Sequence, residues 1–189
     1  FPKNRDENAM IAVASFIAHS LESASLENIA KEAIRVIHRL FDFQFASIAL
    51  RDQDGKFRYL AQLGLPREKE LALFKIRYSK EDLFDEESYP STKISEITRF
   101  YMSESTPFKE DEIETFGRPV MIGKRRLNPD EMLEADYFNV YITDWNQEII
   151  GYLELSLTRS GKLPDRTTIT WMELIATLMG MIISREVRG

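Results

Sequence analysis

The sequence contains no cysteine and two histidines among its 189 residues. The absence of cysteine excludes disulfides, thiolate zinc sites, cysteine nucleophiles and thioether attachment of a cofactor. Two histidines with scattered acidic residues leave a transition-metal site without its usual ligands. The glycine-rich phosphate loops G-x-x-x-x-G-K-[ST] and G-x-G-x-x-G and the nucleophile elbow G-x-S-x-G are also missing. These absences remove the catalytic classes that short motifs reveal most readily.

Long apolar runs are missing as well. The charge-free run 174–184 is shorter than the ~18 apolar residues that suggest a membrane span. There is no signal peptide and no Asn-x-Ser/Thr sequon. The first residue is Phe1 rather than methionine, so we expect a piece cut from a longer cytoplasmic protein that does not contact a membrane.

Basic residues are outnumbered by acidic ones, 25 to 31. The net charge is −6, and residues 79–115 hold eleven acidic and four basic residues, a balance of −7. Nucleic-acid binding needs a basic face. The cluster Lys124-Arg125-Arg126 is too short to supply one, so we expect no nucleic-acid partner.

What the chain does have is a core. Apolar residues make up 43% of it, and 12 residues are phenylalanine. Apolar periodicity predicts helices over 7–22 and 26–41, the first with a stripe of Met10, Val13, Ile17 and Leu21, and the second capped by Ser25. A last helix is expected to start at Asp165 or Thr167.

Two hairpins are predicted by alternating side chains. The first joins strands 45–51 and 57–63 through Asp52-Gln53-Asp54-Gly55, and the second joins 137–143 and 148–158. The middle is less regular: we expect helices at 67–74 and 91–102, an edge strand at 118–122 and a short helix starting at Asn128-Pro129. This order predicts an α+β fold with helices packed on an antiparallel sheet.

Both ends of the chain resemble a GAF domain. The opening LENIAKEAIRVIHRLFDFQFASIALRDQDGKFRYLAQLGLP and the close IIGYLELSLTRSGKLPDRTTITWMELIATLMGMII carry the resemblance, which covers residues 25–186. It implies a profilin-like, six-stranded antiparallel sheet. The N- and C-terminal helices would cover one face, and loops and short helices would roof a small-molecule pocket on the other. We therefore expect a linker or signalling helix at 1–24 and a GAF-like sensory domain at 25–189.

The resemblance also implies a function. GAF domains are mostly sensory modules of signalling proteins such as sensor histidine kinases, and they commonly dimerise through their terminal helices. We expect a non-enzymatic regulatory domain that binds an unknown small molecule and passes its state to an output domain. The alternatives are a ligand-free dimerisation and transmission module, and an enzyme on the same scaffold that uses carboxylates and tyrosines.

The candidate ligand-binding residues come from the aromatic and arginine-rich stretch 94–126 and the following strand. They are Arg99, Tyr101, Arg118, Arg125, Arg126 and Tyr137. The arginines could hold an anionic ligand by bidentate contacts, or they could neutralise the acidic 79–115 surface. Tyr137, Tyr141 and Tyr152 suit either a pocket wall or the edge of the core, and we favour the core.

The candidate dimer interface comes from excess apolar surface on the first and last helices. Its residues are Val13, Phe16, Ile17, Trp171, Ile175, Leu178, Met179 and Ile182. Burial of the last helix within one chain is the alternative.

Three familiar sites are not expected. Asp52-x-Asp54-Gly55 lacks the closing glutamate of a calcium loop, because that position is Leu63. His19 and His38 read as ordinary helix residues rather than haem ligands or phosphoacceptors. Without cysteine the chain cannot attach a bilin covalently, and without an Asn-Lys dipeptide it lacks the signature of cyclic-nucleotide-binding GAF domains. No resident cofactor or metal is expected.

Overall fold

The computed structural model describes residues 5–22, 25–105 and 125–186. The helices are α1 (Arg5–Glu22), α2 (Leu26–Leu40), α3 (Arg67–Leu73), α4 (Lys80–Leu83) and α6 (Arg166–Glu186). The strands are β1 (Phe43–Arg51), β2 (Phe57–Leu63), β3 (Arg77–Tyr78), β4 (Thr92–Lys93), β5 (Thr98–Tyr101), β6 (Tyr137–Thr143) and β7 (Ile149–Thr158). Both predicted hairpins and the helices at 7–22, 26–41 and 67–74 are confirmed to within two residues at each end.

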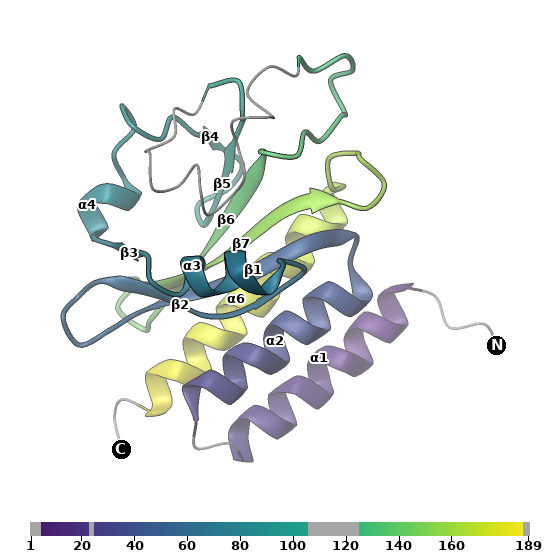
Figure 1. Cartoon of the computed structure of the whole chain (residues 1–189). Helices are drawn as coiled ribbons and strands as arrows, with labels where there is room; N and C mark the ends of the chain where they lie inside the picture. Colours follow the sequence, from purple (N-terminus) through teal and green to yellow (C-terminus); the bar gives the residue numbers. More distant parts are fainter. Residues whose placement is uncertain (1–4, 23–24, 106–124, 187–189) are drawn as a thin grey trace.

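One antiparallel sheet organises the chain, in the order β3-β2-β1-β7-β6-β5-β4. The helices α1, α2 and α6 lie together on one face, called here the back (Figure 1). The short helices α3 and α4 lie on the other side, called the front (Figure 1). The α+β prediction is confirmed. The sheet has seven strands rather than the expected six: five longer strands, and the two-residue strands β3 and β4 at its two edges.

The back core follows from strand alternation. Inward-facing residues of β1, β6 and β7, such as Ile48, Val140 and Leu153, are fully buried beneath α2 and α6. This position explains why α6 is so apolar: Met172, Ala176 and Met179 expose none of their surface. By length and composition α6 could cross a membrane, but 56% of its most apolar window is buried, as in a core helix.

The stripe predicted for the first helix is rotated from the observed one. Among the α1 side chains that the structure describes, the buried ones are Ala9, Val13, Phe16 and Ser20, whereas Met10 is 62% exposed. The side chain of Leu21 lies outside the described part. Both sets have helical spacing, so periodicity alone could not choose between them. Packing against α2 and α6 decides in favour of the small and aromatic side chains.

Two predicted helices are wrong. Residues 91–102 form β4, a turn and β5, because Thr98 and Phe100 point to the back while Arg99 and Tyr101 point to the front. This two-residue period and the Thr-Arg-Phe-Tyr composition favour a strand. At Asn128-Pro129 the chain makes a single turn, closed by a hydrogen bond from Glu131 N to Asn128 O. Glu131 then forms an isolated antiparallel bridge with Lys162. The predicted strand at 118–122 lies outside the described residues.

Candidate functional site

A row of polar side chains crosses the front face of the sheet. Strand register places Arg99 beside Asn139, Asn139 beside Glu154, Glu154 beside Ser47, and Ser47 beside Gln62. These five residues, called here the polar row, come from β5, β6, β7, β1 and β2. Directly paired residues of neighbouring strands have Cβ atoms about 5 Å apart, so the row is continuous. Ser47 and Asn139 in this row are buried, and buried polar groups cost free energy unless they are partnered.

Aromatic residues flank the polar row on both sides. On one side Tyr141 pairs with Tyr152, and the ring of Tyr59 lies edge-on to Tyr152 with 5.9 Å between centroids. On the other side Tyr101 stacks on Tyr137, with centroids 4.5 Å apart. All seven tyrosines of the chain belong to the front side, and none belongs to the core under the helices (Tyr59, Tyr78, Tyr89, Tyr101, Tyr137, Tyr141 and Tyr152).

Two polar atoms in this region are buried without a partner. The Oδ1 atom of Asn139 and the hydroxyl of Tyr152 form no hydrogen bond of normal geometry in the described part of the chain, although the Tyr59 hydroxyl is near enough to that of Tyr152 to affect its pKa. Asn139 exposes 4% of its surface and Tyr152 none. Leaving such an atom unsatisfied costs about 1–3 kcal/mol. The front face therefore holds unused hydrogen-bonding capacity that a small molecule or an ordered water could satisfy.

The tyrosine hydroxyls of the front face are held neutral. Burial raises the pKa of Tyr59 and of Tyr152, and the nearby charge of Glu154 raises both further. The Tyr59 hydroxyl donates to Glu154 Oε2 at 2.8 Å. Burial also raises the pKa of Tyr101, whose hydroxyl lies 3.4 Å from that of Tyr141. The face can therefore offer hydroxyl hydrogen bonds and aromatic surface, but no phenolate, at ordinary pH.

The structure brings together three of the predicted ligand-binding residues. Arg99, Tyr101 and Tyr137 lie on adjacent strands and face the front. The Arg99 guanidinium donates from Nη1 to the carbonyl oxygens of Ser95 (2.8 Å) and Thr98 (3.3 Å). Its Cζ atom lies 5.8 Å from the centre of the Tyr141 ring, a cation–π distance.

Arg126, in contrast, is bound to carboxylates of its own chain. Its Nη2 atom lies 2.9 Å from Asp136 Oδ2 and 3.1 Å from Glu104 Oε2, and its Nη1 atom donates to the carbonyl of Glu131. Asp136 is completely buried and also accepts from the backbone N–H groups of Ser103 and Leu133. This cluster fastens the segment before β6 to the turn after β5.

The remaining predicted ligand residues add little to this picture. Arg125 is exposed, and Arg118 lies outside the described residues. A ligand role for the arginines therefore stays a prediction; among those that the structure describes, Arg99 is the one that belongs to the polar row.

Most residues of the predicted dimer interface are buried within the chain itself. Val13, Phe16, Ile175, Met179 and Ile182 expose 7% of their surface or less, and Ile17, Trp171 and Leu178 are partly buried. The large apolar residues that α1 and α6 do expose are Met10, Ile11, Leu174 and Met181.

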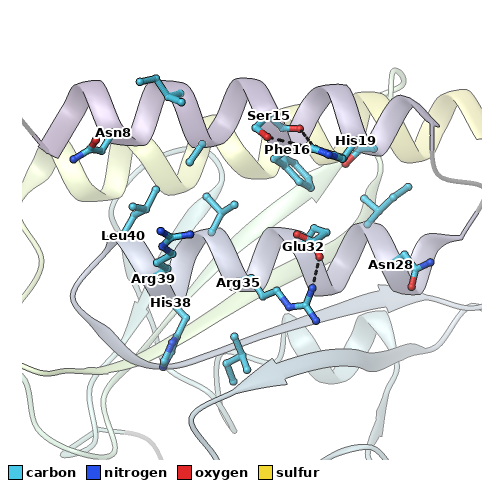
Figure 2. A pocket seen from close by; sticks show the side chains of 16 residues that line it. Asn8, Ser15, Phe16, His19, Asn28, Glu32, Arg35, His38, Arg39 and Leu40 are labelled. Carbon is cyan, nitrogen blue, oxygen red and sulfur yellow. Dashed lines mark hydrogen bonds and ion pairs between the residues drawn. The ribbon is translucent and has the colours of Figure 1, made fainter. Parts of the chain in front are cut away.

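A groove of about 1090 Å3 separates α1 from α2 on the back, and both histidines line it (Figure 2). Several of its polar groups are already engaged. The Nδ1 atom of His19 lies 2.7 Å from the Ser15 carbonyl, Arg35 pairs with Glu32, and His38 Nε2 lies 3.2 Å from Arg159 (Figure 2 draws the first two contacts). The Ser20 hydroxyl, which also lines this groove, is buried without a hydrogen-bond partner in the described part of the chain, but it is a single group, whereas the front face combines Asn139 and Tyr152. In the described part of the chain no group of three or more His, Asp or Glu side chains is placed to hold a metal ion.

Sequence reasoning missed Asn139, Glu154 and Tyr59 as site residues, and it favoured the core for Tyr141 and Tyr152. The signal was present in the alternation Tyr137-x-Asn139-x-Tyr141 and Tyr152-x-Glu154-x-Ser156, since a two-residue period puts each set on one face. What the sequence lacked was the strand order that aligns these sets.

Comparison with known proteins supports the fold through structure rather than sequence. No profile of a known protein family matches the chain, and no curated protein matches it in sequence. The GAF domain/HD domain protein from Geobacter sulfurreducens superposes with a TM-score of 0.63 at 9% identity, covering 92% of this chain and 99% of that one.

Two further solved structures agree. The GAF domain of an Acinetobacter phosphoenolpyruvate-protein phosphotransferase has a TM-score of 0.60 at 11% identity, over 95% of this chain and 94% of its own. The GAF domain of a putative sensor histidine kinase from Pseudomonas syringae pv. tomato has a TM-score of 0.54 at 10% identity, over 97% and 93%. The sheet order, the helical back and these superpositions lead to one conclusion: the chain is a domain with the GAF fold.

Proposed function

We propose that this chain is a small-molecule-sensing regulatory domain of a signal-transduction protein. The observation that carries the proposal is the pair of buried, unpartnered polar atoms, Asn139 Oδ1 and the Tyr152 hydroxyl, in a face lined with tyrosines. Ligand pockets combine apolar and aromatic walls with a few convergent polar groups, and this face has that composition. The similarity to GAF domains of signalling proteins supports a regulatory role rather than an enzymatic one.

The proposal includes the way in which the signal leaves the domain. A ligand on the front face would favour one arrangement of the front elements, and α6 would carry the change to an output domain, as in a sensor histidine kinase. A coupling of about 1–3 kcal/mol is sufficient for regulation. We further propose a cytoplasmic homodimer, with contacts made by the apolar residues that the terminal helices expose, Met10, Ile11, Leu174 and Met181.

A ligand-free transmission module is the second candidate. It is favoured by the close cover of the front face: Tyr59, Tyr101, Tyr141 and Tyr152 expose 4% of their surface or less. The ring of Phe84 contributes to this cover, with its centroid 5.4 Å from that of Tyr141.

Native mass spectrometry of the purified chain distinguishes the two candidates. We expect a retained small molecule, or one taken up from a pool of cell metabolites, and we expect Asn139→Ala to lose it. The matched control is Asn28→Ala on the exposed side of α2, which should keep it. A chain that binds nothing from such a pool, while remaining folded by circular dichroism, would establish the transmission module instead. The same spectra report the number of subunits.

A further inference from the structure

Glu173 is the one charged residue of α6 between Arg166 and Arg185. Its carboxylate does not face solvent freely. The Oε1 atom accepts hydrogen bonds from the hydroxyls of Ser95 and of Thr98, the latter at 2.7 Å. Thr98 is completely buried and points to the back of the sheet. The helix is therefore joined by hydrogen bonds to the turn between β4 and β5.

The same turn is held from the front by Arg99. The guanidinium donates to the carbonyl oxygens of Ser95 and Thr98, so it binds the backbone of the two residues whose hydroxyls bind Glu173. Arg99 in turn lies over the ring of Tyr141. The backbone N–H of Tyr141 donates to the carbonyl of Ile97 at 2.7 Å, which adds a second link between β6 and the turn.

These contacts form an unbroken connection from the front face to α6. It runs from Tyr141 and Arg99, through the turn 95–98, to Glu173, and it passes around the sheet edge rather than through the packed core. Side chains that are fastened by several directional bonds move together, whereas apolar contacts allow sliding. A shift of Arg99 would therefore reach α6 as a displacement at Glu173.

We propose that Glu173 is a positioning residue that couples the front face to α6. The inference rests on the proposed function, because it gives the route by which an occupied front face would change the helix. In the ground state Glu173 holds the turn, and any change that draws Arg99 away from the Ser95 and Thr98 carbonyls loosens the turn and releases this part of α6.

Hydrogen–deuterium exchange of the whole chain tests the coupling without any ligand. Arg99→Gln removes the guanidinium from the front, and Arg99→Lys serves as a second variant if the first folds poorly. We expect either change to speed exchange of the α6 amides that follow Glu173 by about fivefold or more, the lower end of typical coupling factors. In a Glu173→Ala background, the same Arg99 substitution should leave those amides unchanged.

Two further variants separate coupling from general stability. Glu173→Gln keeps a carbonyl oxygen that can accept from the two hydroxyls, so we expect it to retain most of the response to Arg99→Gln. Thr170→Ala lies on the exposed side of the same helix, about one turn before Glu173, and should retain all of it. An α6 response that is equal in the native and the Glu173→Ala backgrounds, or no response in the native background, overturns the inference. Such a result would leave ligand binding on the front face intact, since the mass-spectrometric test does not depend on Glu173.

Discussion

A Cβ atom placed on Gly180 would lie 2.1 Å from the carbonyl oxygen of Thr143. Gly180 sits in the middle of α6, and Thr143 ends β6, so the helix and the sheet touch backbone to backbone at this point. Carbonyl oxygens of a sheet cannot move aside as a flexible side chain can.

Gly180→Ala should therefore destabilise the fold, although alanine is the better helix former. The helix preference of alanine is worth about 1 kcal/mol. The overlap forces α6 away from β6, a kind of overpacking that costs about 1–3 kcal/mol or more. We expect a lower urea midpoint in circular dichroism. Thr177→Ala, on the exposed side of the helix, is the control and should stay close to the native midpoint; an unchanged Gly180→Ala would show that the helix can shift freely.

Asp136→Asn should be among the most damaging single substitutions in the chain. It removes the charge from a completely buried carboxylate that faces Arg126 and accepts two backbone N–H groups. Breaking a buried ion pair on one side costs about 3–5 kcal/mol when the other charge is left uncompensated. Arg126 keeps Glu104 as a partner, so we expect the lower end of that range. Chemical denaturation measures the loss. Glu104→Gln removes the more exposed partner of Arg126 and should cost clearly less; equal losses would contradict the ranking.

Asp165 should make the fold lose stability in acid. Hydrogen bonds from Thr168 and the nearby charge of Arg5 lower the pKa of this carboxyl. A carboxyl whose pKa is lower when folded stabilises the fold above its unfolded pKa of about 3.9, and that contribution disappears as the pH falls through the folded value. The stability advantage of the native chain over Asp165→Asn should thus shrink as the pH falls from about 6 toward 3. Thermal unfolding of both chains over this pH range measures the stability difference. Asp54→Asn, in the β1–β2 turn, is the control, and its stability difference from the native chain should not change in this way. A constant difference for Asp165→Asn would refute the stabilising role of the Asp165 carboxylate.

Ser184→Ala should leave stability unchanged or raise it. The Ser184 hydroxyl is buried on α6 and has no hydrogen-bond partner in the described part of the chain. Removing an unsatisfied buried group recovers part of its cost, up to about 1 kcal/mol. Thr168→Val offers the opposite case on the same helix, because the Thr168 hydroxyl accepts from Arg5 Nη2 at 2.6 Å. We expect the melting temperature to rise or stay level for Ser184→Ala and to fall for Thr168→Val. A fall for both variants would indicate that the Ser184 hydroxyl has a hydrogen-bond partner.

Much of this fold could be predicted from the sequence, because the relevant signals are local. Strong alternation identified β2 and β6 to the residue, and Ser25 and Asp165 marked the starts of α2 and α6. Sequence patterns gave the wrong secondary structure where a helical period and a strand period both fitted the same residues. The stretch 91–102 has apolar residues at helical spacing, yet pairing of β5 with β6 makes it a strand.

The site was less predictable because it depends on strand order. Arg99 could be chosen as a polar residue in an aromatic stretch, but its neighbour Asn139 is forty residues away and Glu154 a further fifteen. Only the register brings them into one row. Arg126, like Arg99, is an arginine in an aromatic and arginine-rich stretch. It is bound to the buried carboxylate of Asp136 instead of facing the front, and no local sequence pattern predicts that Asp136 is buried.

The segregation of tyrosine to the front gives each face of this domain its own optical label. Neither tryptophan is on the front face: Trp171 packs beside Phe41 on the helical side, and Trp145 is in the exposed hairpin between β6 and β7. Tyrosine absorbance therefore senses the side on which a ligand would bind, while indole emission senses Trp171 on the helical side and Trp145 in the β6–β7 turn. Events on the two sides could be timed against each other in one unlabelled sample.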